Sequence, residues 1–197
     1  MIYRGPSEIT DNVNSWFKTF GIPYAISIKQ FGDEITGEVI ALHLLDQRSL
    51  VLVGPSDVGF GIGQLLPVIV QGLVSTSQSL CVEQPEIHLH PKLQASLADF
   101  FIASSGLDPN RDQARSPFVR GTGNQWIIET HSEALVLRLQ KRIREHAISC
   151  EDVCVLYVLP GGESGSRVLK LRLDEDGEFL DTWPEGFFEE SFTEIFG

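Results

Sequence analysis

The chain has few cysteines and no long apolar run. Its three cysteines, Cys81, Cys150 and Cys154, are an odd number in apolar or strand-like surroundings, which argues against a disulfide framework and favours a reducing compartment. No apolar run reaches the ~20 residues that a membrane-spanning helix needs, and the first residues do not resemble a signal peptide. We therefore expect a cytoplasmic protein with no membrane partner.

Basic residues are also scarce. The 15 lysines and arginines are outnumbered by 27 acidic residues, for a net charge of −12. This net charge argues against nonspecific affinity for nucleic acid over the whole surface. Solvated loop and helix faces account for the basic residues better than a binding patch does, so nucleic acid is permitted as a partner but not indicated. The residues in question are Arg111, Arg115, Arg120, Lys141, Arg142 and Arg144.

The composition that remains is that of one globular domain: 197 residues, 42% hydrophobic and 21% charged. The sequence shows no internal repeat. Apolar residues at helical spacing predict a packing helix over 11–20, with Asp11 as its cap. Short β-like runs at 24–28, 38–45 and 49–53 then predict a small antiparallel meander.

A glycine-rich turn at 54–64 leads into an apolar helix. Such a turn presents free backbone N–H groups at the positive end of the helix dipole, which predicts an anion site suited to phosphate. The spacing from Gly54 to Gly59 imitates the first half of a Walker A motif. Phe60 and Gly61 follow where Lys and Ser or Thr are required, and no other segment supplies the motif.

Residues 79–91 form a short apolar run that ends in acidic residues and a histidine pair. They predict a buried strand that carries Glu83 to the edge of a sheet, where α/β proteins bind ligands. Three interpretations follow from these residues. Glu83 could hold Mg²⁺ in a nucleotide hydrolase, His88 and His90 could bind a metal, or Glu83 could bind the ribose of a dinucleotide.

Two of these interpretations have specific weaknesses. The dinucleotide pattern Gly59-x-Gly61-x-Gly63 has Gln64 where the third glycine is wanted, although Glu83 lies about 20 residues further on, as the pattern requires. A metal-dependent barrel hydrolase would need about 250 residues and more ligands. A structural role for the two histidines, in the turn into the next helix, is therefore slightly preferred.

The chain continues with alternating helices and strands. Pro91 is expected to start a helix, and the polar segment 104–123 reads as a long surface loop. Strands are predicted at 125–129 and 153–158, with Ser132 as the cap of the helix between them. This alternation predicts a parallel sheet with right-handed crossovers.

The C-terminal part changes character. Residues 167–173 and 178–180 are predicted to form a hairpin around the turn that starts at Asp174. From Asp174 to the end there is no Lys, Arg or His, and the aromatic side chains among the acids are expected to dock on the body.

Glu83 and His131 are the sharpest pair of candidate residues. Both follow buried strands that are expected to be neighbours in a parallel sheet. An acid to hold Mg²⁺, a polar residue beside it for water, and a histidine that senses the γ-phosphate make a nucleotide-hydrolysis set. The glycine-rich helix start adds an anion site in the same chain.

Three ordered motifs resemble those of ABC-type ATPases. They are a signature motif at 57–64, a Walker B motif with its D-loop at 82–91, and a switch-histidine motif at 129–133. Within that family they resemble the SMC-like and OLD-like bacterial ATP-binding proteins, often described as AAA-family ATPases. Residues 177–188 are similar to a C-terminal region of unknown function in one such family, so that the resemblance covers roughly residues 10–197.

The resemblance implies roles for the residues of the first two motifs. Gly59, Phe60 and Gly61 would form the signature turn that meets the γ-phosphate of ATP held by a second subunit. Glu83 would take the Walker B position near Mg²⁺. Gly63 stands where relatives often carry a serine, so one hydroxyl contact to phosphate would be missing.

The same resemblance implies the catalytic candidates. His88 and His90 would lie in the nucleotide-binding D-loop region at the dimer seam, and His131 would be the switch histidine. Gln84 occupies the position where many relatives carry the catalytic glutamate. An amide can orient a water molecule but cannot accept its proton, so that either Glu86 substitutes or hydrolysis is slow.

The Walker A and Q-loop half, which precedes these motifs in the family, is absent from the sequence. We therefore expect an α/β fold, a partial P-loop NTPase lobe of the ABC type with parallel strands, crossover helices and small antiparallel elements. Its parts would be a lead-in helix and meander at 1–57, the ATPase-like C-terminal lobe at 58–160, and a hairpin with an acidic aromatic tail at 161–197.

The expected function is ATP binding and hydrolysis with Mg²⁺, very weak or absent in this chain alone. Activity would need a Walker A segment, supplied upstream or by a partner subunit, and a homodimer across the nucleotide site. A noncatalytic interaction module, whose acidic tail and long loop meet an effector protein, is the alternative. A Rossmann-type dinucleotide binder is the third interpretation.

Overall fold

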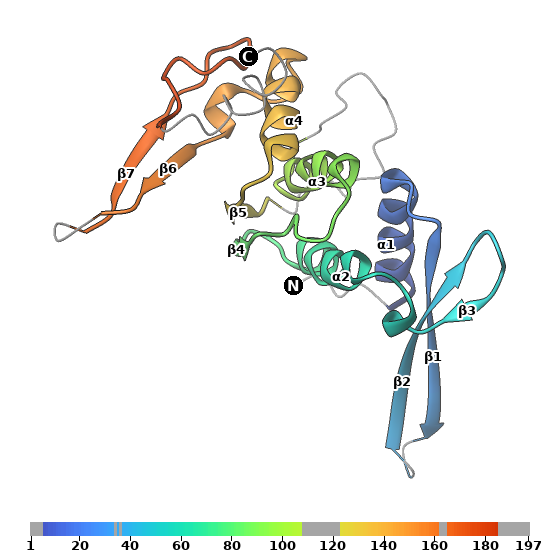
Figure 1. Ribbon diagram of the computed structural model, residues 1–197. Coiled ribbons are helices and arrows are strands. Elements are labelled where there is room, and N and C mark those ends of the chain that lie inside the picture. The colour runs from blue at the N-terminus through green and yellow to red at the C-terminus, as the bar shows by residue number, and fades with distance from the viewer. Residues whose placement is uncertain (1–5, 34, 36, 108–122, 162–164, 185–197) are drawn as a thin grey trace.

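The computed structural model describes residues 6–33, 35, 37–107, 123–161 and 165–184 (Figure 1). Arg111, Arg115 and Arg120 of the predicted loop, and the tail beyond Pro184, lie outside the described residues. None of the helices in the described ranges is long and apolar enough to cross a membrane.

The N-terminal helix α1 (Pro6–Phe20) buries one apolar side of its surface. The sequence predicts this helix correctly, but it begins at Pro6. Asp11 therefore lies inside the helix, and its prediction as the cap is wrong. The buried residues, each at most 3% exposed, are Val13, Trp16, Phe17 and Phe20.

Two long strands, β1 (Tyr24–Asp33) and β2 (Gly37–Asp46), pair antiparallel, and the short β3 (Leu52–Val53) pairs with β2. The predicted meander is confirmed. Asn14 fixes it to α1, because the Asn14 Oδ1 accepts a hydrogen bond from the Ile26 N–H at 2.6 Å. The β1–β2 hairpin then projects away from the helices (Figure 1).

Two parallel strands, β4 (Ser79–Glu83) and β5 (Gln125–Glu129), lie at the centre of the molecule, with Glu83 in register with Glu129. Successive side chains of a strand point to opposite faces. The inner face of this pair carries Val82, Trp126 and Ile128, which pack on the core. The outer face carries Cys81 and Ile127, both exposed.

Helices α2 (Phe60–Val74) and α3 (Pro91–Ser104) pack core residues against that inner face. A short 3₁₀ turn, η1 (Pro55–Asp57), precedes α2. The two helices approach closely at Gly72, because a Cβ there would lie 2.5 Å from the ring of Phe100. The order of the strands corrects one interpretation. β3 pairs antiparallel with β2 and is not a neighbour of β4, so the strand–glycine–helix–strand unit of a dinucleotide-binding fold is not formed.

Helix α4 (Glu133–Arg144) packs on α3. Ser132 caps it as predicted, since its Oγ accepts a hydrogen bond from the Leu135 N–H at 3.1 Å. An ion pair locks the two helices together. Asp99 of α3 is 9% exposed and accepts hydrogen bonds from Arg138 at 2.5 Å and Arg142 at 2.8 Å. Hydrogen bonding to Asp99 raises the pKa of Arg142 above its already high usual value.

The chain then passes through η2 (Cys150–Asp152) into a second hairpin of β6 (Val155–Leu159) and β7 (Arg167–Leu171) (Figure 1). The sequence predicts β6 as a third parallel strand, and this is wrong. An apolar run carries no information on the direction of its partner, and a short connection leads straight back into an antiparallel β7.

The hairpin predicted for 167–173 and 178–180 is formed only in part, because residues 167–171 belong to β7, which pairs with β6. Next to the turn at Asp174 the two predicted segments do pair, through an antiparallel bridge from Leu173 to Phe179 and a hydrogen bond from the Leu180 N–H to the Arg172 carbonyl at 3.0 Å. Among the described tail residues, Trp183 packs its ring on Phe179 and Tyr157, with centroid distances of 4.9 and 5.9 Å. The docking of aromatic side chains on the body is confirmed for this residue.

Candidate functional site

The glycine-rich turn forms the start of α2. Gly59 is the N-cap residue, no side chain caps this end, and the neighbouring Phe60 is 83% exposed. A Cβ at Gly61 would lie 2.8 Å from the carbonyl oxygen of His88. Only glycine therefore allows the first turn of α2 to rest directly on the loop that follows β4.

The loop from Gln84 to His90 reverses the chain between β4 and α3. The Gln84 N–H donates to the Glu129 carbonyl at 2.8 Å and extends the parallel ladder by one bond. Gln84 and His88 both have positive φ values, 43° and 62°. Left-handed backbone at residues other than glycine costs on the order of 1 kcal/mol or more each and concentrates at functional sites.

The two histidines of this loop have different settings. His90 is the N-cap residue of α3, and its Nδ1 accepts a hydrogen bond from the Lys92 N–H at 3.2 Å. This agrees with a structural role in the turn. His88 is exposed, and its ring lies 5.9 Å from that of Phe60, centroid to centroid. The structure thus brings Phe60, Gly61 and His88 together.

Glu86 connects this loop to the one that follows β5. Its side chain is 7% exposed, and its Oε1 accepts a hydrogen bond from the His131 backbone N–H at 2.7 Å. Its Oε2 is also buried and has no hydrogen-bond donor in the part of the chain that the structure describes. Burial of a carboxylate oxygen without a hydrogen-bond donor is energetically costly.

Gln94, on the first turn of α3, makes the second connection. Its Nε2 donates to the carbonyl oxygens of Leu89 at 3.0 Å and Glu86 at 3.4 Å. Its Oε1 accepts a hydrogen bond from the Ser132 Oγ at 2.7 Å. Gln94 is not among the site residues predicted from the sequence, because nothing in its spacing shows that its amide reaches two loops.

Carboxylates gather where β4 and β5 end. Glu83 and Glu129 are exposed register partners on adjacent strands, and strands in a sheet lie about 4.8 Å apart. The Glu129 Oε1 lies 4.0 Å from the Nε2 of His131. Over the described ranges, no three His, Cys, Asp or Glu side chains form a group able to hold a metal ion by themselves. The carboxylates of Glu83 and Glu129 are the kind of ligand that Mg²⁺ takes from a protein, with phosphates and water completing its coordination.

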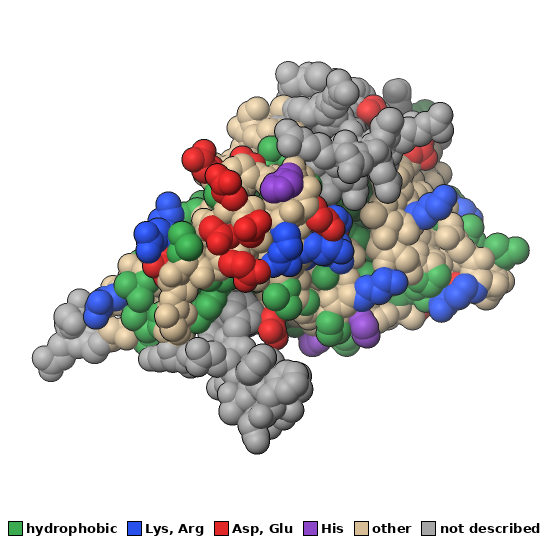
Figure 2. Space-filling view, turned by 90° about the horizontal axis from the view of Figure 1, so that it is seen from above, with side chains coloured by type: hydrophobic (Ala, Val, Ile, Leu, Met, Phe, Trp, Pro, Cys, Tyr) green, Lys and Arg blue, Asp and Glu red, His purple; other side chains and the backbone are tan. Residues whose placement is uncertain are grey.

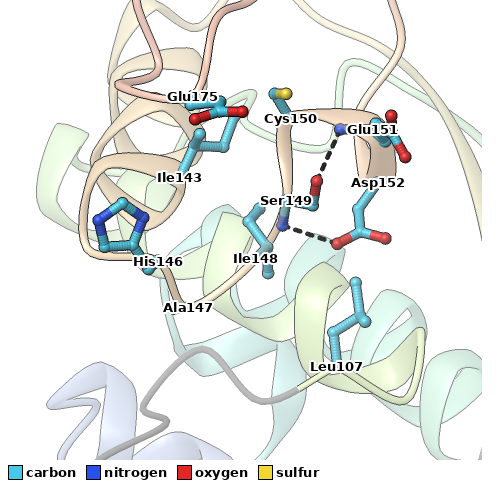
Figure 3. Close-up of a pocket in the computed structure, with 10 residues that line it drawn as sticks. All are labelled: Leu107, Ile143, His146, Ala147, Ile148, Ser149, Cys150, Glu151, Asp152 and Glu175. Carbon is cyan, nitrogen blue, oxygen red and sulfur yellow. Dashed lines mark hydrogen bonds between the residues drawn. The ribbon is translucent and has the colours of Figure 1, made fainter.

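A separate cavity of about 400 Å³ lies beyond the end of α4. It is bordered by Ser149, whose N–H donates to Asp152 at 2.8 Å and whose Oγ accepts from the Glu151 N–H at 3.2 Å (Figure 3). Acidic side chains gather on one face of the molecule in the view from above (Figure 2). None of the predicted site residues lines this cavity.

The sequence profile of the AAA ATPase domain family matches residues 7–136, which is more than half of the chain and includes every predicted site residue from Gly59 to His131. The chain belongs to the AAA ATPase domain family. Membership in this family implies nucleotide binding. The mixed α/β fold class predicted from the sequence is confirmed. No curated protein sequence matches the chain.

Two solved structures share the fold of this AAA ATPase domain. One is the SMC head bound to the C-terminal winged-helix domain of ScpA, with a TM-score of 0.58 and 13% identity. The alignment covers 85% of this chain and 43% of that one, so the chain spans less than half of the length of that SMC head. The second comes from work on ATP-driven dimerisation and DNA-stimulated activation of SMC ATPases, with a TM-score of 0.52, 13% identity and 83% of both chains covered.

Proposed function

We propose that this AAA ATPase domain is the C-terminal lobe of an ABC-type ATPase and builds an ATP site together with a segment that carries a Walker A motif. One observation supports this most directly: the loop after β4 contacts both the start of α2 and the loop after β5. Gly61 rests on the His88 carbonyl, and Glu86 bonds to the His131 N–H. Three motifs separated in sequence thus occupy one surface.

In this proposal the loops after the parallel strands supply the groups around the phosphates. Glu83 holds Mg²⁺ and the neighbouring Gln84 orients a water molecule with its amide, while His131 contacts the γ-phosphate. Bound Mg²⁺ would supply charge neutralisation at the phosphates. Since an amide accepts no proton, we expect slow turnover.

The exposed signature turn supports a second copy of the lobe as the partner across the site. The N–H groups at the start of α2, with Gly59 as the cap, face an anion favourably. Phe60 and His88 are exposed beside them, and His90 lies at the end of the same loop. We propose that this surface meets ATP held by another subunit.

The outer face of β4 and β5 supports the need for a Walker A-bearing segment. Ile127 is 57% exposed, Cys81 is exposed beside it in register, and Glu83 lies on the same face. An apolar sheet face next to candidate catalytic acids is the kind of surface that a second layer covers.

Calorimetry with MgATP tests the proposal on this chain alone and after addition of the Walker A-bearing half. We expect binding and turnover only in the mixture, with both weakened by Glu83→Gln and by His131→Ala. Glu151→Gln, which removes an exposed acid remote from these loops, is the matched control and should bind as the unmodified chain does. A mixture that forms a complex but binds no MgATP would contradict the proposal and favour a noncatalytic interaction module.

A further inference from the structure

Glu86 is positioned to act on the His131 loop more directly than on substrate. Its carboxylate is 7% exposed, and one of its two oxygens already accepts the His131 N–H at 2.7 Å. A general base must reach the proton of a bound water molecule within hydrogen-bond distance. A carboxylate that faces the protein interior and is held by a backbone donor is poorly placed for that reaction.

Gln94 strengthens the same connection from the side of α3. Its amide N–H₂ group holds the Leu89 and Glu86 carbonyl oxygens at 3.0 and 3.4 Å, both in the loop after β4. Its amide oxygen accepts from Ser132 at 2.7 Å, in the loop after β5. One side chain therefore contacts both loops, and its oxygen and nitrogen have distinct partners.

We propose that Glu86 and Gln94 are positioning residues that clamp the loop 84–90 to the loop 130–132, so that Gln84, His88 and His131 keep one relative arrangement. The purpose of this clamp rests on the proposed ATPase function, whereas the contacts that form it do not. Gln84 and His88 have left-handed backbone conformations, which persist only when the surrounding structure supports them. The contacts of Glu86 and Gln94 would supply that support.

Hydrogen exchange of the His131 amide tests the clamp in the full chain without nucleotide. Glu86→Ala removes the acceptor, and we expect the His131 amide to exchange about tenfold faster or more, as the loss of a bond to a charged group implies. Glu86→Gln keeps a carbonyl oxygen for the same N–H and should restore protection. Unchanged exchange of this amide in Glu86→Ala would overturn the proposal.

Glu129→Gln is the matched control of this experiment, and Gln94→Glu tests the second contact of the clamp. Glu129→Gln neutralises the acid that lies 4.0 Å from the His131 ring but leaves the backbone bond in place, so protection should remain. Gln94→Glu keeps the acceptor for Ser132 and replaces the donor group with an oxygen, so exchange should rise in both loops. Amides of the buried residues Leu97 to Phe101 report global unfolding and should remain protected throughout.

Turnover in the reconstituted ATPase separates a positioning residue from a base. If Glu86 positions, Glu86→Gln keeps kcat within about threefold, whereas Glu86→Ala lowers kcat more than it changes KM. If Glu86 accepts the proton, Glu86→Gln abolishes turnover despite a protected His131 amide, and the proposal is wrong. If no reconstituted assembly hydrolyses ATP, the proposed function fails while the exchange experiment still decides the clamp.

Discussion

Gly61 shows how one missing side chain can bring two distant segments together. The start of α2 and the His88 loop are 27 positions apart in the chain, and they touch because position 61 has no Cβ. Gly63, two positions further along α2, is also a glycine, but a Cβ there would meet nothing within 4 Å. A comparison of substitutions at these two glycines therefore distinguishes the effect of a packing contact from the effect of helix propensity.

Gly61→Ala is predicted to destabilise the chain relative to Gly63→Ala. Alanine gains about 0.5–1 kcal/mol over glycine inside a helix, which should appear at position 63. At position 61 the new Cβ must push the His88 backbone away, and overpacking costs about 1–3 kcal/mol. Urea unfolding of both variants measures the difference. Equal midpoints would show that this contact does not restrain the loop.

The individual residues of the site could be predicted from the sequence, but the hydrogen bonds between them could not. Glu86, His131 and Ser132 are recognisable from their motifs. The bond from the His131 N–H to Glu86 spans 45 positions and depends on the register of β4 against β5. Register is a property of the assembled sheet, and so no local pattern predicts that Glu86 turns inward.

At the scale of elements, residue types that favour helix ends gave two correct predictions, whereas Asp11 lies inside α1 and does not cap it. Pro91 and Ser132 start their helices as predicted, because both act within one turn of chain. The partner of β6 could not be predicted in the same way. The side chains of β6 alternate between half-buried and exposed, and Leu156 and Val158 are more than half exposed. One face of this hairpin is therefore exposed.

The α3–α4 ion pair is predicted to be a main stabilising contact between these helices. Asp99→Asn leaves Arg138 and Arg142 facing a neutral amide in a largely buried setting, which should cost about 3 kcal/mol. Arg144→Gln is the control, because Arg144 pairs with Glu178 at an exposed position and should change stability by less than about 1 kcal/mol. Thermal unfolding of both variants provides the comparison. A larger loss in Arg144→Gln would contradict the importance of the buried pair.

At the scale of the whole molecule, two hairpins extend in different directions from a helical body whose central sheet is open on one face (Figure 1). The fold class was predictable, since alternating strands and helices with ordered motifs suffice for it. The open face was not, because exposure of Ile127 depends on which elements cover the sheet. An apolar residue in a strand reads as buried in the sequence alone.

Ile127→Asp is predicted to block assembly with the Walker A-bearing half while the chain itself stays folded. The side chain is 57% exposed, so its replacement should lower the free energy of unfolding by only about 1 kcal/mol, the range of strand propensities, but a buried aspartate at the joint surface would weaken the complex. Leu137→Asp, at a 52% exposed position on α4, is the control for added charge. Size-exclusion chromatography of the mixtures measures complex formation. Co-elution of Ile127→Asp would place the joint surface elsewhere.

The two-stranded centre also has a consequence for the life of the chain in the cell. Within the described residues, β4 and β5 pair only with each other, so each has an outer edge that no strand covers, beside the exposed Cys81 and Ile127. Such edges recruit strands from other molecules and promote aggregation. Synthesis of the chain in excess over whatever covers this sheet would therefore reduce the yield of soluble protein and increase its demand for chaperones.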